Sequence, residues 1–278
     1  MTDAGPARPA IARLTAVAAI LALACAVVVA AAPGADAAAR ASTTVRIASV
    51  RPASGDLLVA GETAVVRGTT SANLAGERLV LQREKGGRWV GTGAGAKVRA
   101  DGTYRIRFTA RGMGDARYRV RFSGTSSKAP SRRIREVTVW RWISLVPYVT
   151  GGNLTVGGAN VAGLHHDRVL RARGVDGGRP DRGTLALTGR CDGIVVVIGV
   201  ADASDPGFVA EFAMSLDGEE VLTGASVAAG SSAVVALKTT GAAELGLEAS
   251  YPEVPGTRSG AAVWAQPQAL CRARPRQP

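Results

Sequence analysis

Two cysteines, Cys191 and Cys271, bracket the segment that most limits what this chain can fold into. Between them, short runs with a two-residue apolar period are separated by Gly, Asp, Ser and Pro, a pattern that predicts packed antiparallel strands. Residues 194–200 are almost wholly apolar, as in a strand inside a sheet, and along residues 208–216 the larger apolar side chains occupy every second position. A jelly-roll β-sandwich is the simplest closed arrangement of such strands.

The remaining cysteine, Cys25, lies in an N-terminal apolar run. Cys191 and Cys271 are therefore the one pair available to a mature, exported chain. A disulfide that closes a loop of about 80 residues stabilises a fold by roughly 4 to 5 kcal/mol in the chain-entropy model. Two reduced, buried thiols are the alternative.

The N-terminus has the layout of a secretory signal peptide. Arg8 and Arg13 precede an apolar run at residues 14–32, and residues 35–37 (Ala-Asp-Ala) supply a cleavage site. Residues 1–37 are therefore predicted to direct export, which makes the protein secreted or cell-envelope-associated and extracytoplasmic. An uncleaved membrane anchor is the alternative, because the run is just long enough to span a bilayer, and the membrane would then be contacted through this segment alone. The residues before Cys25 match a bacterial lipoprotein box only loosely.

Residues 44–140 form a strongly basic module with the pattern of another sandwich. Residues 44–142 carry 20 Lys and Arg against 7 Asp and Glu, whereas residues 143–278 carry 11 against 13. Seven or eight short strand-like runs in about 100 residues predict an immunoglobulin-like fold. The runs are residues 44–50, 63–67, 78–83, 88–90, 97–99, 103–109, 117–122 and 134–139. Any affinity for polyanions is expected in this module.

Two of these runs alternate apolar residues with arginines: Arg105 and Arg107 in one, and Arg117, Arg119 and Arg121 in the other. The arginines then lie on the outer face of a sheet. They are candidates for binding an anionic wall polymer, because phosphate neutralisation increases with local positive charge. The alternative is a solvated basic face, and the two rows need not form one patch, because consecutive strands of a sandwich often lie in opposite sheets. Nucleic acid is disfavoured, because no aromatic residue alternates with the arginines on that face.

Residues 140–272 carry a set of motifs that resembles a known family. They are Trp142-Ile143-Ser144-Leu145, Val197-Ile198-Gly199-Val200 followed by Asp202, Asp217-Gly218, Thr240-Gly241-Ala242-Ala243-Glu244-Leu245, and Trp264 with Cys271. The segment resembles the NPCBM-type carbohydrate-binding module first associated with family 98 glycoside hydrolases, as found in secreted actinobacterial proteins. The resemblance implies a galactose-binding-like jelly roll over residues 141–272 that holds a glycan without catalysing a reaction. Residues 273–278 are expected to be a disordered tail.

The basic module also carries a resemblance. Its G-x-W hairpin at residues 87–89 and its Asp-Gly-Thr-Tyr strand start at residues 101–104 are similar to segments of bacterial immunoglobulin-like repeats.

Sugar recognition usually combines an aromatic platform with polar side chains in a concavity. The candidates in or near predicted loops and strand ends are Tyr148, His165, His166, Asp202, Asp205, Tyr251 and Trp264. Each has a structural alternative: Trp264 can be a core residue, and the two aspartates can cap turns or supply oxygens to a calcium ion.

The two adjacent histidines predict no shared metal site. They point to opposite sides of an extended strand, and no Cys or third His accompanies them. The family has two residues between a Gly-Leu pair and a histidine, whereas here Gly163-Leu164 runs straight into His165, a shift that weakens the role that the resemblance implies for either histidine.

The sequence lacks the motifs of the common enzyme classes. It has no G-x-S-x-G and no H-E-x-x-H, and residues 91–95 (Gly-Thr-Gly-Ala-Gly) lack the G-x-G-x-x-G spacing. The sequence therefore predicts a secreted, non-catalytic protein that binds polysaccharide or cell-wall glycan and uses no cofactor. The alternatives are a structural or protein-interaction sandwich without sugar binding, and a polyanion binder that uses the basic module.

Overall fold

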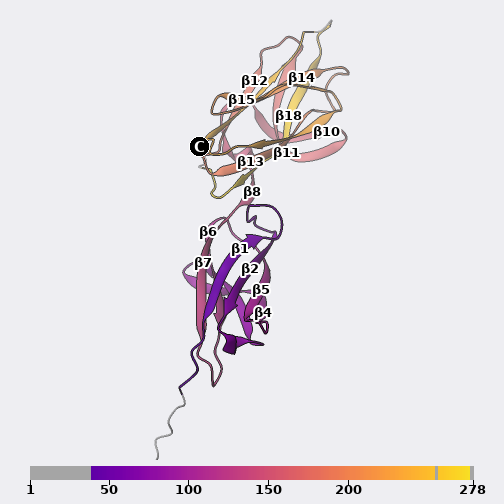
Figure 1. The fold of residues 1–278 in the computed structure, drawn as a ribbon. Helices are drawn as coiled ribbons and strands as arrows, with labels where there is room; N and C mark the ends of the chain where they lie inside the picture. Colours follow the sequence, from indigo (N-terminus) through magenta and orange to yellow (C-terminus); the bar gives the residue numbers. More distant parts are fainter. Residues whose placement is uncertain (1–38, 254–255, 276–278) are drawn as a thin grey trace, which may run out of the picture. The chain divides into compact units, whose positions relative to one another are not determined.

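The computed structural model describes residues 39–253 and 256–275. The expected signal segment at residues 1–37 and the last residues of the expected tail lie outside these ranges. The described elements are β-strands and two short 3-10 turns, and the strands form four antiparallel sheets (Figure 1). The sheets pair into two β-sandwiches, as the sequence predicts. None of the described residues forms a helix with the length and apolar character of a membrane span.

The first sandwich contains seven strands in two sheets. The three-stranded sheet has the order β1-β2-β5, and the four-stranded sheet has the order β4-β3-β6-β7. The short turn η1 (Ala72–Leu74) connects β2 with β3. The strands are β1 (Val45–Pro52), β2 (Thr63–Thr70), β3 (Arg78–Lys85), β4 (Arg88–Lys97), β5 (Thr103–Thr109), β6 (Gly114–Phe122) and β7 (Ser131–Val139).

Alternation along β5 and β6 fills the core of the first sandwich. Tyr104, Ile106 and Phe108 of β5 are buried, and the arginines between them are exposed. The ring of Phe108 packs against that of Tyr118 from β6, with centroids 4.9 Å apart. Side chains of successive strand residues point to opposite faces, so the alternating sequence determines which face is core.

The loop between β3 and β4 is the predicted hairpin turn. Gly86 and Gly87 have φ of 56° and 73°, the left-handed values that a two-residue type I′ turn requires and that glycine adopts without strain. The separate strand expected at residues 97–99 is not formed, because the Gly-rich stretch that follows Val90 continues β4 as far as Lys97.

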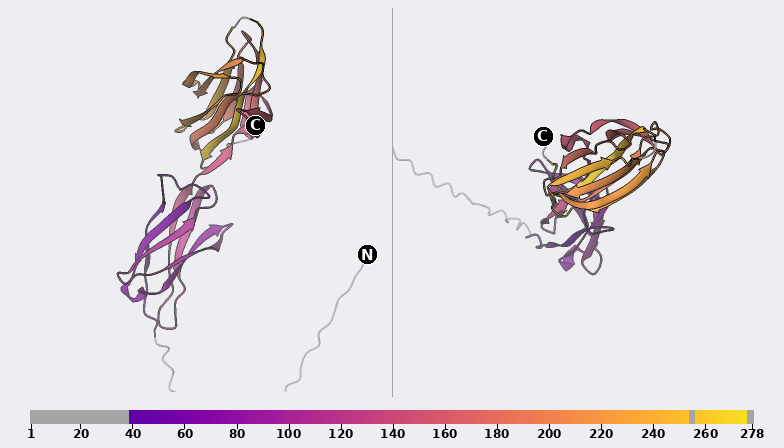
Figure 2. Two further views of the ribbon diagram at one scale, coloured as in Figure 1. Left: turned by 90° about the vertical axis from the view of Figure 1, so that its right-hand side faces the viewer. Right: turned by 90° about the horizontal axis from the view of Figure 1, so that it is seen from above.

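The second sandwich consists of a six-stranded and a five-stranded sheet. The first has the order β10-β11-β18-β13-β16, with β8 also paired to β18, and the second has the order β15-β14-β17-β12-β9. Figure 2 shows these strands as two curved layers. The elements are β8 (Arg141–Ser144), η2 (Val146–Tyr148), β9 (Val149–Gly152), β10 (Thr155–Val161), β11 (Leu164–Val175), β12 (Asp181–Ala186), β13 (Cys191–Val200), β14 (Val209–Leu216), β15 (Glu219–Ala228), β16 (Ser232–Lys238), β17 (Glu244–Ser250) and β18 (Ser259–Cys271).

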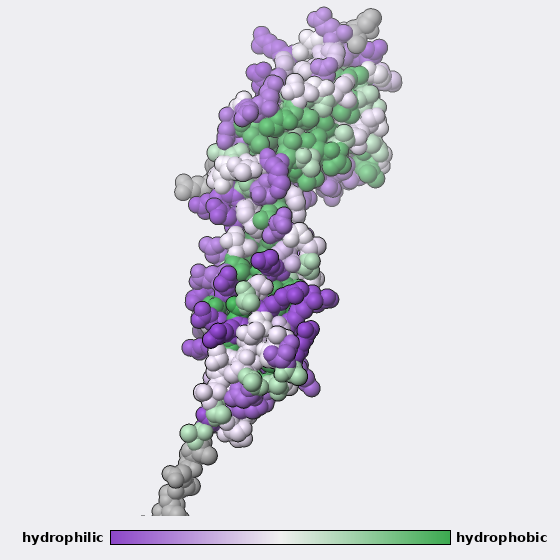
Figure 3. Space-filling model, in the orientation of Figure 1, coloured by the Kyte–Doolittle hydropathy of each residue, from purple (hydrophilic) through white to green (hydrophobic). Residues whose placement is uncertain are grey.

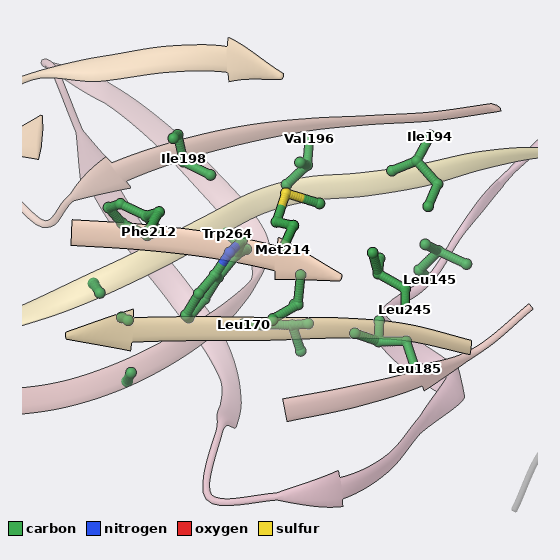
Figure 4. Packing of buried hydrophobic residues seen from close by; sticks show 14 of the residues in the cluster. Leu145, Leu170, Leu185, Ile194, Val196, Ile198, Phe212, Met214, Leu245 and Trp264 are labelled. Atoms are coloured by element: carbon green, nitrogen blue, oxygen red, sulfur yellow. The ribbon is translucent and has the colours of Figure 1, made fainter. Parts of the chain in front are cut away.

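Trp264 of β18 lies at the centre of the second core. Its ring meets that of Phe212 from the opposite sheet edge-on, with centroids 5.2 Å apart. Figure 4 shows Trp264 beside Leu170 and Met214, and all four side chains are fully buried. The inward positions predicted along β14 are thereby confirmed for Phe212 and Met214.

The predicted disulfide between Cys191 and Cys271 is present. The two residues are directly opposite each other where β13 begins and β18 ends, and both are buried. The bond therefore joins two neighbouring strands at the end of the sheet where β8 pairs with β18.

The Gly-, Arg- and Asp-rich sequence after β9 predicts loops around short strands at residues 154–156 and 168–171, whereas the structure forms a longer hairpin there from β10 and β11. The end of β10 reaches across the sheet, where Val161 forms a β-bridge with Ala201 just after β13. A small second hydrophobic cluster lies beneath this closure and contains Val161, Val169, Ala201, Ala261, Val263 and Ala265.

Candidate functional site

The two predicted histidines lie on opposite sides of β11. His165 is exposed, with its Nδ1 2.7 Å from Asn160 Oδ1 and its Nε2 3.2 Å from Asp167 Oδ1. His166 is buried, and its Nδ1 has no hydrogen-bond partner among the described residues. The histidines therefore do not share a site, and the described part of the chain holds no group of three or more His, Cys, Asp or Glu placed to hold a metal ion.

The two predicted aspartates anchor the loop that follows β13. Asp202 Oδ2 accepts a hydrogen bond from the backbone N–H of Gly163 at 3.0 Å. Asp205 Oδ2 accepts from the N–H of Ser259 at 2.7 Å and from its hydroxyl at 3.2 Å. Since these carboxylates hold the loop against its neighbours, their role in this structure is to position backbone.

The three aromatic candidates are buried core residues, which is the structural alternative that the sequence offered for Trp264. Trp264 is fully buried, and Tyr148 and Tyr251 are buried as well, so none of their rings offers a free face. The hydroxyl of Tyr251 donates to Asp181 Oδ2, and burial together with this bond raises the pKa of Tyr251 above its usual value. The signal for burial was their position within or next to apolar strands.

A cavity of about 440 Å³ opens at the end of the second sandwich opposite the disulfide. Strand β11 contributes two arginines, the loop after it contributes a third, and two serines come from the loop after β13 and from β18. We call it the arginine cavity; it is lined by Arg171, Arg173, Gly174, Val175, Gly178, Arg179, Ala201, Ala203, Ser204, Ser259, Gly260 and Ala261.

The strand register explains why a hollow forms there. Arg171 and Arg173 of β11 lie opposite Val263 and Ala261 of β18, so long side chains face small ones across the pair. The next pair along the two strands is Gly174 opposite Gly260.

These two glycines are required by the core. A Cβ on Gly174 would enter the ring of Tyr251, and a Cβ on Gly260 would enter the ring of Phe208. The two rings pack on each other with centroids 5.6 Å apart, so part of the cavity floor is glycine backbone resting on an aromatic pair.

The charge of the arginine cavity is not neutralised by the described residues. None of its three arginines forms a salt bridge, and Arg171 Nε is buried without a hydrogen-bond partner among them. The neighbouring carboxylate of Asp176 accepts from Arg258, at 3.2 Å from its N–H and 3.5 Å from Nη1. Arg171 Nη1 donates to the carbonyl of Gly158 at 3.4 Å, and the hydroxyl of Ser259 donates to Asp205. Among the described residues, the guanidinium groups of Arg173 and Arg179 and the hydroxyl of Ser204 are therefore the donors left for a ligand, and they suit an anionic, oxygen-rich one.

The arginines predicted to bind polyanions do not form one surface. Arg105 and Arg107 lie on the outer face of the three-stranded sheet, whereas β6 carries Arg117, Arg119 and Arg121 in the four-stranded sheet. The guanidinium of Arg119 lies over the ring of Trp89 at 4.5 Å, an aromatic contact that the sequence did not indicate.

Comparison with known proteins gives matches to solved structures only. No family model and no curated protein matches the chain. The chain is similar to the CBM51-2 and INT domains of Clostridium perfringens ZmpB, with 11% identity, a TM-score of 0.37, and coverage of 58% of this chain and 38% of that one. It is also similar to the CBM51 of Clostridium perfringens GH95 in complex with methyl-galactose, with 11% identity, a TM-score of 0.35, and coverage of 46% of this chain and 99% of that one. A further match is bovine butyrophilin, with 12% identity and a TM-score of 0.25 over 84% of this chain and 98% of that one.

Proposed function

We propose that the second sandwich is a non-catalytic module that binds an acidic glycan in the arginine cavity. The observation that carries the proposal is the group of three arginines and two serine hydroxyls around a hollow of about 440 Å³. Binding sites for small ligands commonly occupy about 300 to 1,000 Å³. Carboxylate, sulfate or phosphate groups on a sugar would accept paired N–H bonds from guanidinium groups.

Preorganised loops support this proposal. Ser204 Oγ accepts a hydrogen bond from the N–H of Ala261 at 3.1 Å, and Asp205 holds Ser259 from the same loop. The serine hydroxyls therefore stand at fixed positions on the rim, so that little ordering of the protein opposes binding.

We further propose that the protein works outside the cytoplasm, secreted or attached to the cell envelope. The disulfide and the signal-like N-terminal sequence support this location. The first sandwich, with the seven strands of an immunoglobulin-like domain, then acts as a spacer that carries the glycan-binding module.

The test is a glycan array probed with the full-length protein. The expected result is retention on uronate-, sialate-, sulfate- or phosphate-bearing glycans and little on neutral ones. Replacing Arg173 and Arg179 with Gln should abolish retention. The matched control replaces Arg190 and Arg272 with Gln, which removes two exposed charges at the disulfide end of the same sandwich. Retention only on neutral glycans would reject the acidic ligand.

A second candidate function, protein interaction without sugar binding, is favoured by an exposed apolar strand. Val234 of the edge strand β16 is 71% exposed and lies opposite Val197 of β13. Figure 3 shows hydrophobic residues gathered on one face of the second sandwich. Exposed apolar patches often mark interaction surfaces. A protein that binds no glycan on the array but self-associates, and loses self-association on Val234→Lys, would support this function instead.

A further inference from the structure

The outer face of the three-stranded sheet in the first sandwich carries two adjacent rows of arginine side chains. Arg67 of β2 lies directly opposite Arg105 of β5. One pleat along, Val65 of β2 is flanked by Arg51 of β1 and Arg107 of β5. The four arginines are exposed, whereas Val65 is buried although it lies on the outer face. This burial is expected where the aliphatic parts of neighbouring arginine side chains cover a small apolar residue.

Two hollows border the Arg67–Arg105 pair. One, of about 370 Å³, extends toward Arg51 and Val65, and the other, of about 390 Å³, extends toward Arg99 in the turn before β5. We call this surface the arginine face and define it by Arg51, Arg67, Arg99, Arg105 and Arg107. Its guanidinium groups therefore surround space that a ligand can enter.

The arginine face is uncompensated by acidic groups in the described ranges. None of its five members takes part in a salt bridge there. Asp101 lines one hollow, but its carboxylate accepts from the N–H and the hydroxyl of Thr103 at 2.9 and 2.7 Å. Repulsion from Arg67, with smaller contributions from burial and from Arg107 and Arg99, lowers the pKa of Arg105. Like charges directly opposite on neighbouring strands destabilise a sheet, and a bound anion would relieve that cost.

The arginines of β6 show the contrasting arrangement. Arg117 pairs with Glu84 at 2.8 Å and with Glu136 at 3.1 Å. Arg119 donates to Gln82 Oε1 at 2.7 Å and lies over Trp89. Because protein groups already satisfy these two side chains, they are a matched control for the arginine face.

The spacing of the arginine face favours a linear polymer with closely spaced anionic groups. Residues opposite each other on neighbouring antiparallel strands are about 5 Å apart, and residues two apart on one strand are about 6.7 Å apart. Guanidinium groups bind phosphate oxygens in pairs. The aromatic residues of β1, β2 and β5 are Tyr104 and Phe108, and both are buried, so these strands present no platform for nucleic-acid bases.

We propose that the arginine face binds a linear phosphodiester polymer without bases, of the poly(glycerol phosphate) type. The site lies on a different sandwich from the arginine cavity and uses none of its residues. This proposal revises the polyanion hypothesis from the sequence. It keeps Arg105 and Arg107, replaces the arginines of β6 with Arg51, Arg67 and Arg99, and infers the ligand from the spacing between the arginines.

The test measures binding of the full-length protein to poly(glycerol phosphate), to single-stranded DNA of matched charge and to neutral dextran. For about four phosphate contacts, affinity should fall roughly 50-fold between about 50 mM and about 200 mM salt. Replacing Arg67 and Arg105 with Gln should weaken binding and reduce the slope of log affinity against log salt by about 1.4. The control replaces Arg117 and Arg119 with Gln and should change neither.

Each outcome decides the proposal. Absence of binding to poly(glycerol phosphate) at low salt overturns it, as does an equal loss in the two double variants, because binding would then follow net charge. Tighter binding to DNA overturns the assignment of the polymer. The Arg67→Gln/Arg105→Gln variant should keep its retention on acidic glycans, so failure of the glycan proposal and failure of this one are separately visible. Circular dichroism confirms that each variant is folded.

Discussion

Removing the disulfide should destabilise the second sandwich by about 4.5 kcal/mol. Cys191 and Cys271 are 80 residues apart in sequence, and the chain-entropy model converts a closed loop of that length into this value. Both residues are buried, and β13 and β18, on which they lie, are paired along their length by backbone hydrogen bonds as well as by the disulfide. Replacing both cysteines with Ala therefore leaves the folded register intact and acts mainly on the unfolded chain.

Urea unfolding, followed by tryptophan fluorescence, measures this effect, because Trp89 reports on the first sandwich and the buried Trp264 on the second. With a slope of about 2 kcal/mol per M, the midpoint of the second sandwich should fall by about 2 M in the Cys191→Ala/Cys271→Ala variant. The transition of the first sandwich, which contains neither cysteine, is the internal control. The wild-type protein treated with reductant should behave like the variant.

The same variant separates stability from binding. The arginine cavity lies at the other end of β13 and β18, about 30 Å along the strands from the disulfide. Glycan affinity below the unfolding transition should therefore stay within about twofold of wild type. A midpoint shift below about 0.5 M, or a loss of glycan binding in the folded variant, would refute this reasoning.

Three further predictions concern single positions. Tyr251→Phe removes the donor to the buried Asp181 and should lower the free energy of unfolding by about 1 to 3 kcal/mol, measured by urea unfolding. Gly174→Ala should cost about 1 to 3 kcal/mol or more, because its Cβ meets the Tyr251 ring; a neutral result in thermal unfolding would contradict the packing. The hydrogen bond from the Thr103 N–H, and to a smaller extent the one from its hydroxyl, lower the pKa of Asp101 in the folded protein. Ionised Asp101 therefore stabilises the fold at pH values above the pKa that it has in the unfolded chain, and this contribution is lost as the pH falls through the lower pKa of the folded state. NMR titration should show that pKa rise on Thr103→Ala, and an unchanged value would contradict the assignment.

Strand positions were predictable from alternating apolar and polar residues wherever one face of a strand is buried and the other is exposed to solvent. Along β5 the alternation of Tyr104, Ile106 and Phe108 with arginines predicts both the strand and its orientation, and its ends at 103 and 109 agree with the sequence. The disulfide was predictable because Cys191 and Cys271 are the one pair of cysteines that lies outside the N-terminal apolar run.

The arginine cavity was not predictable, because it depends on register between distant strands. The sequence predicts a short strand that ends at Arg171, but the Gly-, Arg- and Asp-rich residues after it favour a loop, so the continuation of β11 through Arg173 was not expected. Only pairing with β18, about 90 residues later, places Ala261 opposite Arg173 and creates the hollow. Candidates chosen by residue type, such as Trp264, lie in the core, because burying a large aromatic ring stabilises the fold more than leaving it exposed to water.

The affinity of an acidic glycan for the arginine cavity tests the central claim most directly. Titration calorimetry should compare the wild-type protein, the Arg173→Gln/Arg179→Gln variant and the Arg190→Gln/Arg272→Gln control, with the best acidic ligand from the array. Loss of two charge-assisted hydrogen bonds predicts about a 100-fold weaker affinity in the cavity variant and no change in the control. Equal affinities in all three proteins would contradict the account.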